Sequence, residues 1–271
     1  MILPSIYFSS KIAKKQAIKV ITGLSNFKIE DIVMKIQAAE LKGATYVDFA
    51  AHPDIVSVAK SITILPICAS SINPIDLYSF VLAGADLVEI GNFDALYSRG
   101  IFFSRQQILD TVYQTKKLLG KVAICATIPH TFSLTDQIKL AVELEILGVD
   151  ILQTEGRSSK TRFLAIKPSK AFTAAYKASS TISSVYTLSN YVCTPVLASS
   201  GLDYLSAPIA MNYGASIIGV SSALNQFRDI DDMAHYIQKI VTSLNLNRYK
   251  SKQFDCTNDH NRDINKQNII C

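Results

Sequence analysis

The chain has 271 residues, a hydrophobic fraction of 49% and a formal net charge of +5, from 27 Lys and Arg against 22 Asp and Glu. This length and composition fit one large α/β domain, or two small ones, with a sizeable buried core. The basic residues are scattered apart from Lys11–Lys19 and the C-terminal region, and the apolar runs are only strand-sized. We therefore expect neither a nucleic acid nor a membrane as a partner.

Short apolar runs alternate along the chain with amphipathic stretches that are long enough for helices. After a lead-in over residues 1–16, strands are predicted at 17–23, 45–50, 64–70, 86–92, 121–127, 150–156, 195–201 and 216–222. Helices are predicted at 30–41, 53–59, 74–83, 104–119, 134–147, 171–184, 207–213 and 231–244. Eight such units predict a (β/α)8 TIM barrel, a single α/β domain over residues 17–244. The polar residues 245–271 are expected to form a mobile tail.

The cysteines are odd in number and widely spaced: Cys68, Cys125, Cys193, Cys256 and Cys271. This usage indicates reduced, packed thiols rather than a disulfide framework or a CxxC metal site. The N-terminal residues lack the features of a secretory signal and the Arg-rich character of a transit peptide. If the protein acts in an organelle, we therefore expect it to be made there.

Several specific blocks occur in one order along the chain. They are VEIGNFDALYSRGIFFS (88–104), ATIPHTFSLTDQ (126–137), DILQTEG (150–156), and the pair ASSGL and GVSSAL (198–202 and 219–224). Through these blocks the chain resembles the hypothetical chloroplast reading frame twenty-three family of algal plastids and cyanobacteria. The resemblance implies a TIM barrel and a plastid-encoded protein of the chloroplast stroma, and it implies no particular reaction.

Three charged residues lie within predicted strands: Lys19, Asp48 and Glu89. Barrel strands are covered on both faces, so charges there must be paired, hydrogen-bonded or solvated at the barrel mouth. One interpretation is a buried ion network that fixes the interior layers. The other is a catalytic set, in which Lys19 is an electrostatic anchor or a Schiff-base amine and Asp48 or Glu89 transfers protons.

The strand DILQTEG ends in polar residues, and in a TIM barrel such strand ends form the mouth at the C-terminal face. Gln153 and Thr154 are predicted to line the pocket there. Glu155 is our first choice for a general base or for a contact to a sugar hydroxyl. The alternative is that Glu155 caps the next helix or pairs with Arg157 or Lys160.

Asn92 and His130 follow two other strands and are also predicted to line the pocket. Together with His52 and the carboxylates, His130 raises the question of a metal site. No HxH, HxxxH or CxxC spacing supports one, so no metal is expected.

Two neighbouring strands end in serine and glycine, in ASSG and GVSS. Such residues let the backbone approach a ligand with its N–H groups free, and phosphate commonly binds after the last two strands of a TIM barrel. The predicted phosphate-binding residues are Ser200, Gly201, Gly219, Ser221 and Ser222. Because no Lys or Arg is adjacent in the sequence, we expect backbone dipoles to supply the attraction. The alternative is that these small residues only let the two strands pack tightly.

Two classes of function fit these features. The first is an enzyme that acts on a phosphorylated small molecule or uses flavin mononucleotide (FMN), with Lys19, Asp48, Glu89 and Glu155 facing the reacting part. The second is a non-catalytic barrel that binds a phosphorylated metabolite and reports it to a partner.

Overall fold

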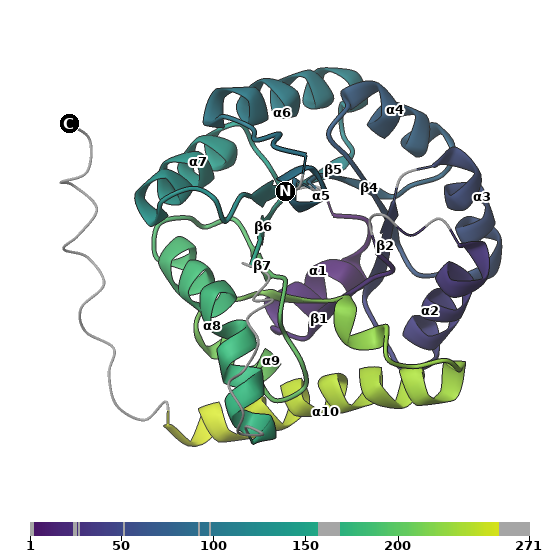
Figure 1. Ribbon diagram of the computed structural model, residues 1–271, viewed down its shortest axis with the longest axis vertical. Helices are drawn as coiled ribbons and strands as arrows, with labels where there is room; N and C mark the ends of the chain where they lie inside the picture. Colours follow the sequence, from purple (N-terminus) through teal and green to yellow (C-terminus); the bar gives the residue numbers. More distant parts are fainter. Residues whose placement is uncertain are drawn as a thin grey trace.

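The structure, a computed structural model, describes residues 3–23, 26, 28–50, 52–91, 93–97, 99–156 and 169–254. Eight parallel strands close into a barrel in chain order, with β1 pairing β8 (Figure 1). The strands are β1 Ala17–Ile21, β2 Tyr46–Ala50, β3 Ile67–Ser71, β4 Leu87–Ile90, β5 Ala123–Ile128, β6 Ile151–Thr154, β7 Val196–Ala198 and β8 Ile217–Val220. The predicted (β/α)8 TIM barrel is confirmed, and each strand lies at its predicted place within about three residues.

Helices surround the barrel, and most begin and end near their predicted bounds (Figure 1). They are α2 Ile29–Leu41, α3 Pro53–Ile62, α4 Pro74–Leu82, α6 Arg105–Leu119, α7 Leu134–Ile146, α8 Lys170–Ser189, α9 Ala207–Asn212 and α10 Ile230–Phe254, with a 3-10 turn η1 at Ser222–Leu224. Local signals set their ends. Ser104 and Gln107 form a capping box at the start of α6, and Gly148, at φ 76°, ends α7 in the left-handed conformation.

A short helix, α1 (Ile6–Ala13), closes the N-terminal end of the barrel, where the sequence pattern predicts only a lead-in. Ser5 caps it, since its hydroxyl accepts a hydrogen bond from the Phe8 N–H at 3.1 Å. Phe8 and Ile12 are buried against inward-facing side chains from the beginnings of the strands, and the Phe8 ring lies 4.9 Å from that of Tyr46. The lower barrel interior is therefore filled mainly by apolar side chains, which form an apolar plug.

Two further differences from the predicted elements concern α5 and α10. A four-residue helix, α5 (Asp94–Tyr97), follows β4, and α10 continues to Phe254, past the boundary predicted at 244. Helix α10 packs along α2 and α9. The predicted tail therefore begins as helix, and residues 255–271 lie outside the described part of the chain. Among the described residues, no helix has the length and apolar character needed to span a membrane.

Candidate functional site

A buried ion cluster lies at mid-height inside the barrel, above the apolar plug. The Lys19 ammonium, on β1, pairs with Glu89 of β4 and lies 2.7 Å from Asp48 Oδ2 of β2, and all three side chains are fully buried. The contact to Asp48 Oδ2 is ionic rather than an aligned hydrogen bond. The structure thus brings together the three charged residues that were singled out in the sequence.

Polar side chains from three more strands complete the coordination of this cluster. Ser70 donates to Asp48 Oδ1 at 2.7 Å, and Thr127 donates to Glu89 Oε1 at 2.9 Å. Gln153 accepts from the Lys19 ammonium at 2.9 Å and donates to Glu89 Oε1 at 2.7 Å. Gly91 leaves the space for this arrangement, because a Cβ there would lie 2.4 Å from Glu89 Oε1 and 2.6 Å from Thr127 Oγ1.

The charges of the cluster hold Lys19 in its protonated form. Burial by itself lowers the pKa of Lys19, but the carboxylates of Asp48 and Glu89 outweigh burial and raise that pKa well above its ordinary value. For Asp48, burial is the largest effect and raises the pKa to about 6, although Lys19 opposes it. Lys19 is therefore held as an ammonium rather than a free amine, and the pKa of Asp48 lies well above that of an ordinary aspartate.

Three buried side chains here, Asp48, Cys68 and Glu89, come close enough together to ligate a metal ion, with ligand atoms within 4.8 Å of one another. The Lys19 ammonium contacts both carboxylates of this group and supplies the positive charge that a metal would bring. Burial raises the pKa of the Cys68 thiol well above its ordinary value, which keeps it protonated and a poor ligand. Cys68 and Cys125 are both free thiols in the interior.

A second polar cluster lies at the C-terminal mouth of the barrel, around Glu155, which directly follows the last residue of β6. Glu155 Oε2 contacts His130 Nδ1 at 2.8 Å and accepts from the Tyr97 hydroxyl at 2.7 Å. Glu155 is almost completely buried and His130 is about one-fifth exposed. Glu155 and His130, predicted from different strands, therefore form one unit, and the unexpected helix α5 supplies Tyr97.

The loops after β7 and β8 lie side by side, because Leu197 and Ala198 pair with Ile217 and Ile218. Ser200 has φ 86° and Gly201 has φ 70°, so two successive residues adopt the left-handed conformation that non-glycine residues avoid. No described residue accepts a hydrogen bond from the N–H groups of Ser200, Gly201 or Ser222. Gly219 lies near the end of β8, where a Cβ would lie 3.0 Å from Ser199 Oγ, so the glycine gives room to the loop after β7.

Gly201 also has a packing role, since a Cβ there would lie 2.2 Å from the Lys177 carbonyl oxygen of α8. Gly43 has a similar φ of 76°, but a Cβ there would meet no atom within 4 Å, which makes Gly43 a matched control. We expect Gly201→Ala to lower the free energy of unfolding by about 2 kcal/mol and Gly43→Ala by about 1 kcal/mol, in urea denaturation. Equal losses would show that the contact with α8 is readily relieved.

The fold and the two polar clusters occur in a chain with recognisable relatives. A family model described as "Protein of unknown function (DUF561)" matches residues 5–250. The chain belongs to this family. It is 45% identical over 249 residues to "Uncharacterized protein ycf23" of Antithamnion sp., covering 90% of each chain. It is 39% identical to the protein of the same name from Pyropia yezoensis, covering 95% of this chain and 90% of that one. The ycf23 relatives are plastid-encoded in algae, which implies a plastid origin and agrees with the resemblance seen in the sequence.

Solved structures similar to this DUF561 barrel share its fold at low identity. Deoxyribose phosphate aldolase from Aeropyrum pernix superposes with a TM-score of 0.60 at 16% identity, covering 87% of this chain and 94% of that one. Thiamine phosphate pyrophosphorylase from Pyrococcus furiosus gives a TM-score of 0.58 at 17% identity, covering 86% and 98%. These comparisons establish the TIM-barrel architecture.

One buried cation that contacts the segment after β8 was not predicted from the sequence. Lys35 of α2 is almost fully buried, and its ammonium donates to the Thr22 carbonyl at 2.9 Å and to Asn225 Oδ1 at 3.0 Å, and pairs with Asp31 at 2.8 Å. It thereby ties the loop after β1 to the segment after β8. The sequence does indicate that Lys35 is buried, because it falls on the same helical stripe as the buried Ile32 and Ile36.

The remaining predicted site residues have structural roles or lie outside the described chain. The Thr154 hydroxyl accepts a hydrogen bond from the Ser199 N–H at 3.2 Å, so it supports the start of the loop after β7, residues 199–201. His52 caps α3, where its ring nitrogen accepts from the Asp54 N–H. Asn92 lies outside the described residues, as do Arg157 and Lys160, the alternative partners of Glu155.

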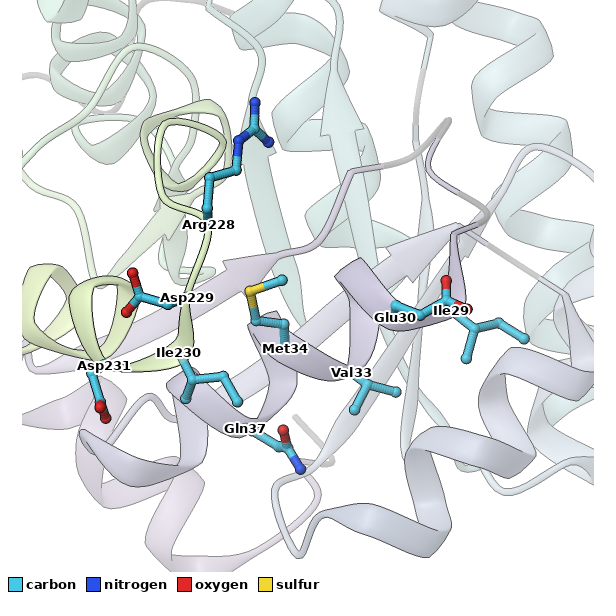
Figure 2. Close-up of a pocket in the computed structure, with 9 residues that line it drawn as sticks. All are labelled: Ile29, Glu30, Val33, Met34, Gln37, Arg228, Asp229, Ile230 and Asp231. Carbon is cyan, nitrogen blue, oxygen red and sulfur yellow. The ribbon is translucent and has the colours of Figure 1, made fainter.

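An open groove of about 580 Å³ lies on the outer helical layer, between α2 and the start of α10 (Figure 2). Apolar side chains from α2 form its floor, and Arg228 and Asp229 stand at its edge. None of its lining residues comes from a strand end. The groove is therefore separate from the two polar clusters inside the barrel.

Proposed function

We propose that the C-terminal face of this barrel binds a phosphorylated small molecule, with its phosphate between the loops after β7 and β8. The observation that carries the proposal is the left-handed pair Ser200 and Gly201, whose successive N–H groups have no acceptor among the described residues. Backbone held in such sparsely populated conformations is typical of ligand-binding sites, and consecutive N–H groups form anion-binding concavities.

Three further observations support this location. The loops after the last two strands are the usual phosphate site of the TIM barrel. The Lys35 ammonium, which is paired with Asp31, donates to Asn225 Oδ1 and so braces the segment after β8, a contact that the sequence pattern did not predict. Both of the solved structures compared above are named for phosphorylated compounds.

We further propose that the reacting part of the compound lies toward Lys19 and Glu155, so that the barrel is an enzyme. The Lys19 ammonium would stabilise negative charge that develops on the compound, and Asp48, with its pKa raised to about 6 by burial, would exchange a proton. We place this activity in the plastid stroma, where plastid genomes are translated.

A non-catalytic metabolite-binding barrel is the second candidate, and one observation favours it. Lys19, Asp48 and Glu89 are fully buried and already paired with one another, which is also what a purely structural network requires. Both candidates need the same phosphate site, so the phosphate site is tested first.

Replacing Ser222, which is exposed at the start of η1, tests the phosphate site with little cost in packing. We expect Ser222→Asp to weaken binding of inorganic phosphate about tenfold or more in calorimetric titration, because a carboxylate at the lip repels the anion. The matched variant Ser222→Asn has nearly the same size without the charge and should bind within about twofold of wild type. Equal binding by all three proteins would remove the site from these loops.

The visible spectrum of the purified protein separates the two kinds of ligand. Bound FMN would make the protein yellow, whereas a sugar phosphate would leave it colourless. The same spectrum recorded on Ser222→Asp shows whether the binding of any flavin depends on the loops after β7 and β8.

A further inference from the structure

Glu155 Oε2 is held by three hydrogen-bond donors at the barrel mouth. The Tyr97 hydroxyl donates at 2.7 Å, the His130 backbone N–H donates at 3.1 Å, and the His130 Nδ1 lies at 2.8 Å. The backbone bond fixes the loop after β5 against the end of β6. The Tyr97 ring meets the imidazole edge-on at 5.3 Å and limits its rotation.

These contacts define the protonation pattern of the imidazole. Because Glu155 Oε2 can only accept from Nδ1, the neutral ring carries its proton on Nδ1 and its lone pair on Nε2. Among the described residues none forms a hydrogen bond with Nε2, and the side chain is about one-fifth exposed. Glu155, by contrast, is nearly buried and engaged by several donors, so it is poorly placed to abstract a proton itself.

We propose that His130 is a proton-transfer group at the mouth of this barrel, in addition to Asp48 in its interior, and that Glu155 is the positioning residue of His130. In the step, Nε2 accepts a proton from an O–H or acidic C–H of the bound compound, and the electron pair stays on that compound. The resulting imidazolium is stabilised by the Glu155 carboxylate. The proposal rests on the proposed function for the identity of the compound class, and it assigns the base role to His130 instead of Glu155.

The test reads the ring nitrogens of ¹⁵N-histidine-labelled, ligand-free protein by NMR, with His130→Gln to identify the resonances. We expect the neutral His130 ring to carry its proton on Nδ1 in wild type and in Glu155→Gln, which keeps an acceptor oxygen. In Glu155→Ala we expect a mixture of the Nδ1–H and Nε2–H tautomers. An Nε2–H form in the wild-type protein would overturn the proposal. Because no phosphate is present, this result does not depend on the phosphate site.

Diethyl pyrocarbonate, which acylates unprotonated imidazole nitrogens, gives a second readout by mass spectrometry of peptides. We expect His130 to react at Nε2 in wild type and to react more slowly at Nε2 in Glu155→Ala, because the carboxylate no longer holds the proton on Nδ1 and the lone pair on Nε2. His52, which is about half exposed, serves as an internal reference whose rate should not change. An unreactive His130 in the wild-type protein, or an equal rate in both proteins, would contradict the proposed base and its orientation.

Discussion

Lys19→Met is expected to lower the free energy of unfolding by about 3–5 kcal/mol at pH 7, the largest effect of any single change considered for this protein. The substitution removes the ammonium and leaves Asp48 and Glu89 fully buried without their cation. Such carboxylates escape part of the cost by taking up protons, so the loss should be smaller at pH 5 than at pH 8. Urea denaturation followed by circular dichroism at the two pH values measures both effects.

Lys60→Met is the matched control, because Lys60 pairs with Asp86 on the surface, where both side chains are partly exposed. We expect that change to cost less than about 1 kcal/mol, as surface ion pairs usually do. A loss below about 1 kcal/mol for Lys19→Met as well would mean that water reaches the cluster. Stability alone does not distinguish a structural cluster from a catalytic one. A catalytic Lys19 is also required for conversion of the bound compound, whereas a structural Lys19 is not.

The stability of the wild-type protein is expected to fall by about 3 kcal/mol, relative to Asp48→Asn, as the pH rises from about 4 to about 6. Burial raises the pKa of Asp48 to about 6 in the folded state, against 3.8 for an ordinary aspartate. Below pH 3.8 both states hold the proton, and above it the unfolded state releases its proton first, which favours unfolding until the folded carboxyl also ionises. The stabilisation is thus complete at low pH and lost as the pH passes 6.

Denaturation of both proteins at several pH values between 4 and 7 gives the difference curve directly. Asp54→Asn controls for the loss of a carboxylate, since Asp54 is largely exposed on α3 and should give a curve parallel to wild type. Parallel curves for wild type and Asp48→Asn would show that Asp48 titrates like a solvated aspartate.

The sequence was sufficient for the barrel because its pattern is local and repeated. Short apolar strands alternate with amphipathic helices, and that alternation identified every strand within about three residues. Helix α1 was missed because its apolar contacts, Phe8 and Ile12, meet the beginnings of strands that are distant in sequence. The end of α10 was missed because its last residues are polar and show no apolar stripe.

The sequence predicted the residues of the candidate site that lie within the strands or at their C-terminal ends. Lys19, Asp48 and Glu89 could be grouped because inward-facing charges on barrel strands must meet. The partnership of Glu155 with His130 and Tyr97 could not be read from spacing, since it depends on how the loops after β4 and β5 fold over the mouth. Gly201 itself was singled out in the sequence. Its close approach to α8, which leaves no room for a Cβ, depends on the packing of the helix and could not be predicted.

Native mass spectrometry of the protein isolated from its own host tests the central claim most directly. We predict that wild type retains one small molecule per chain, that this molecule releases phosphate on fragmentation, and that Ser222→Asn retains it while Ser222→Asp does not. A wild-type protein that carries a compound without phosphorus, or an equally loaded Ser222→Asp variant, would contradict a phosphate site formed by the loops after β7 and β8.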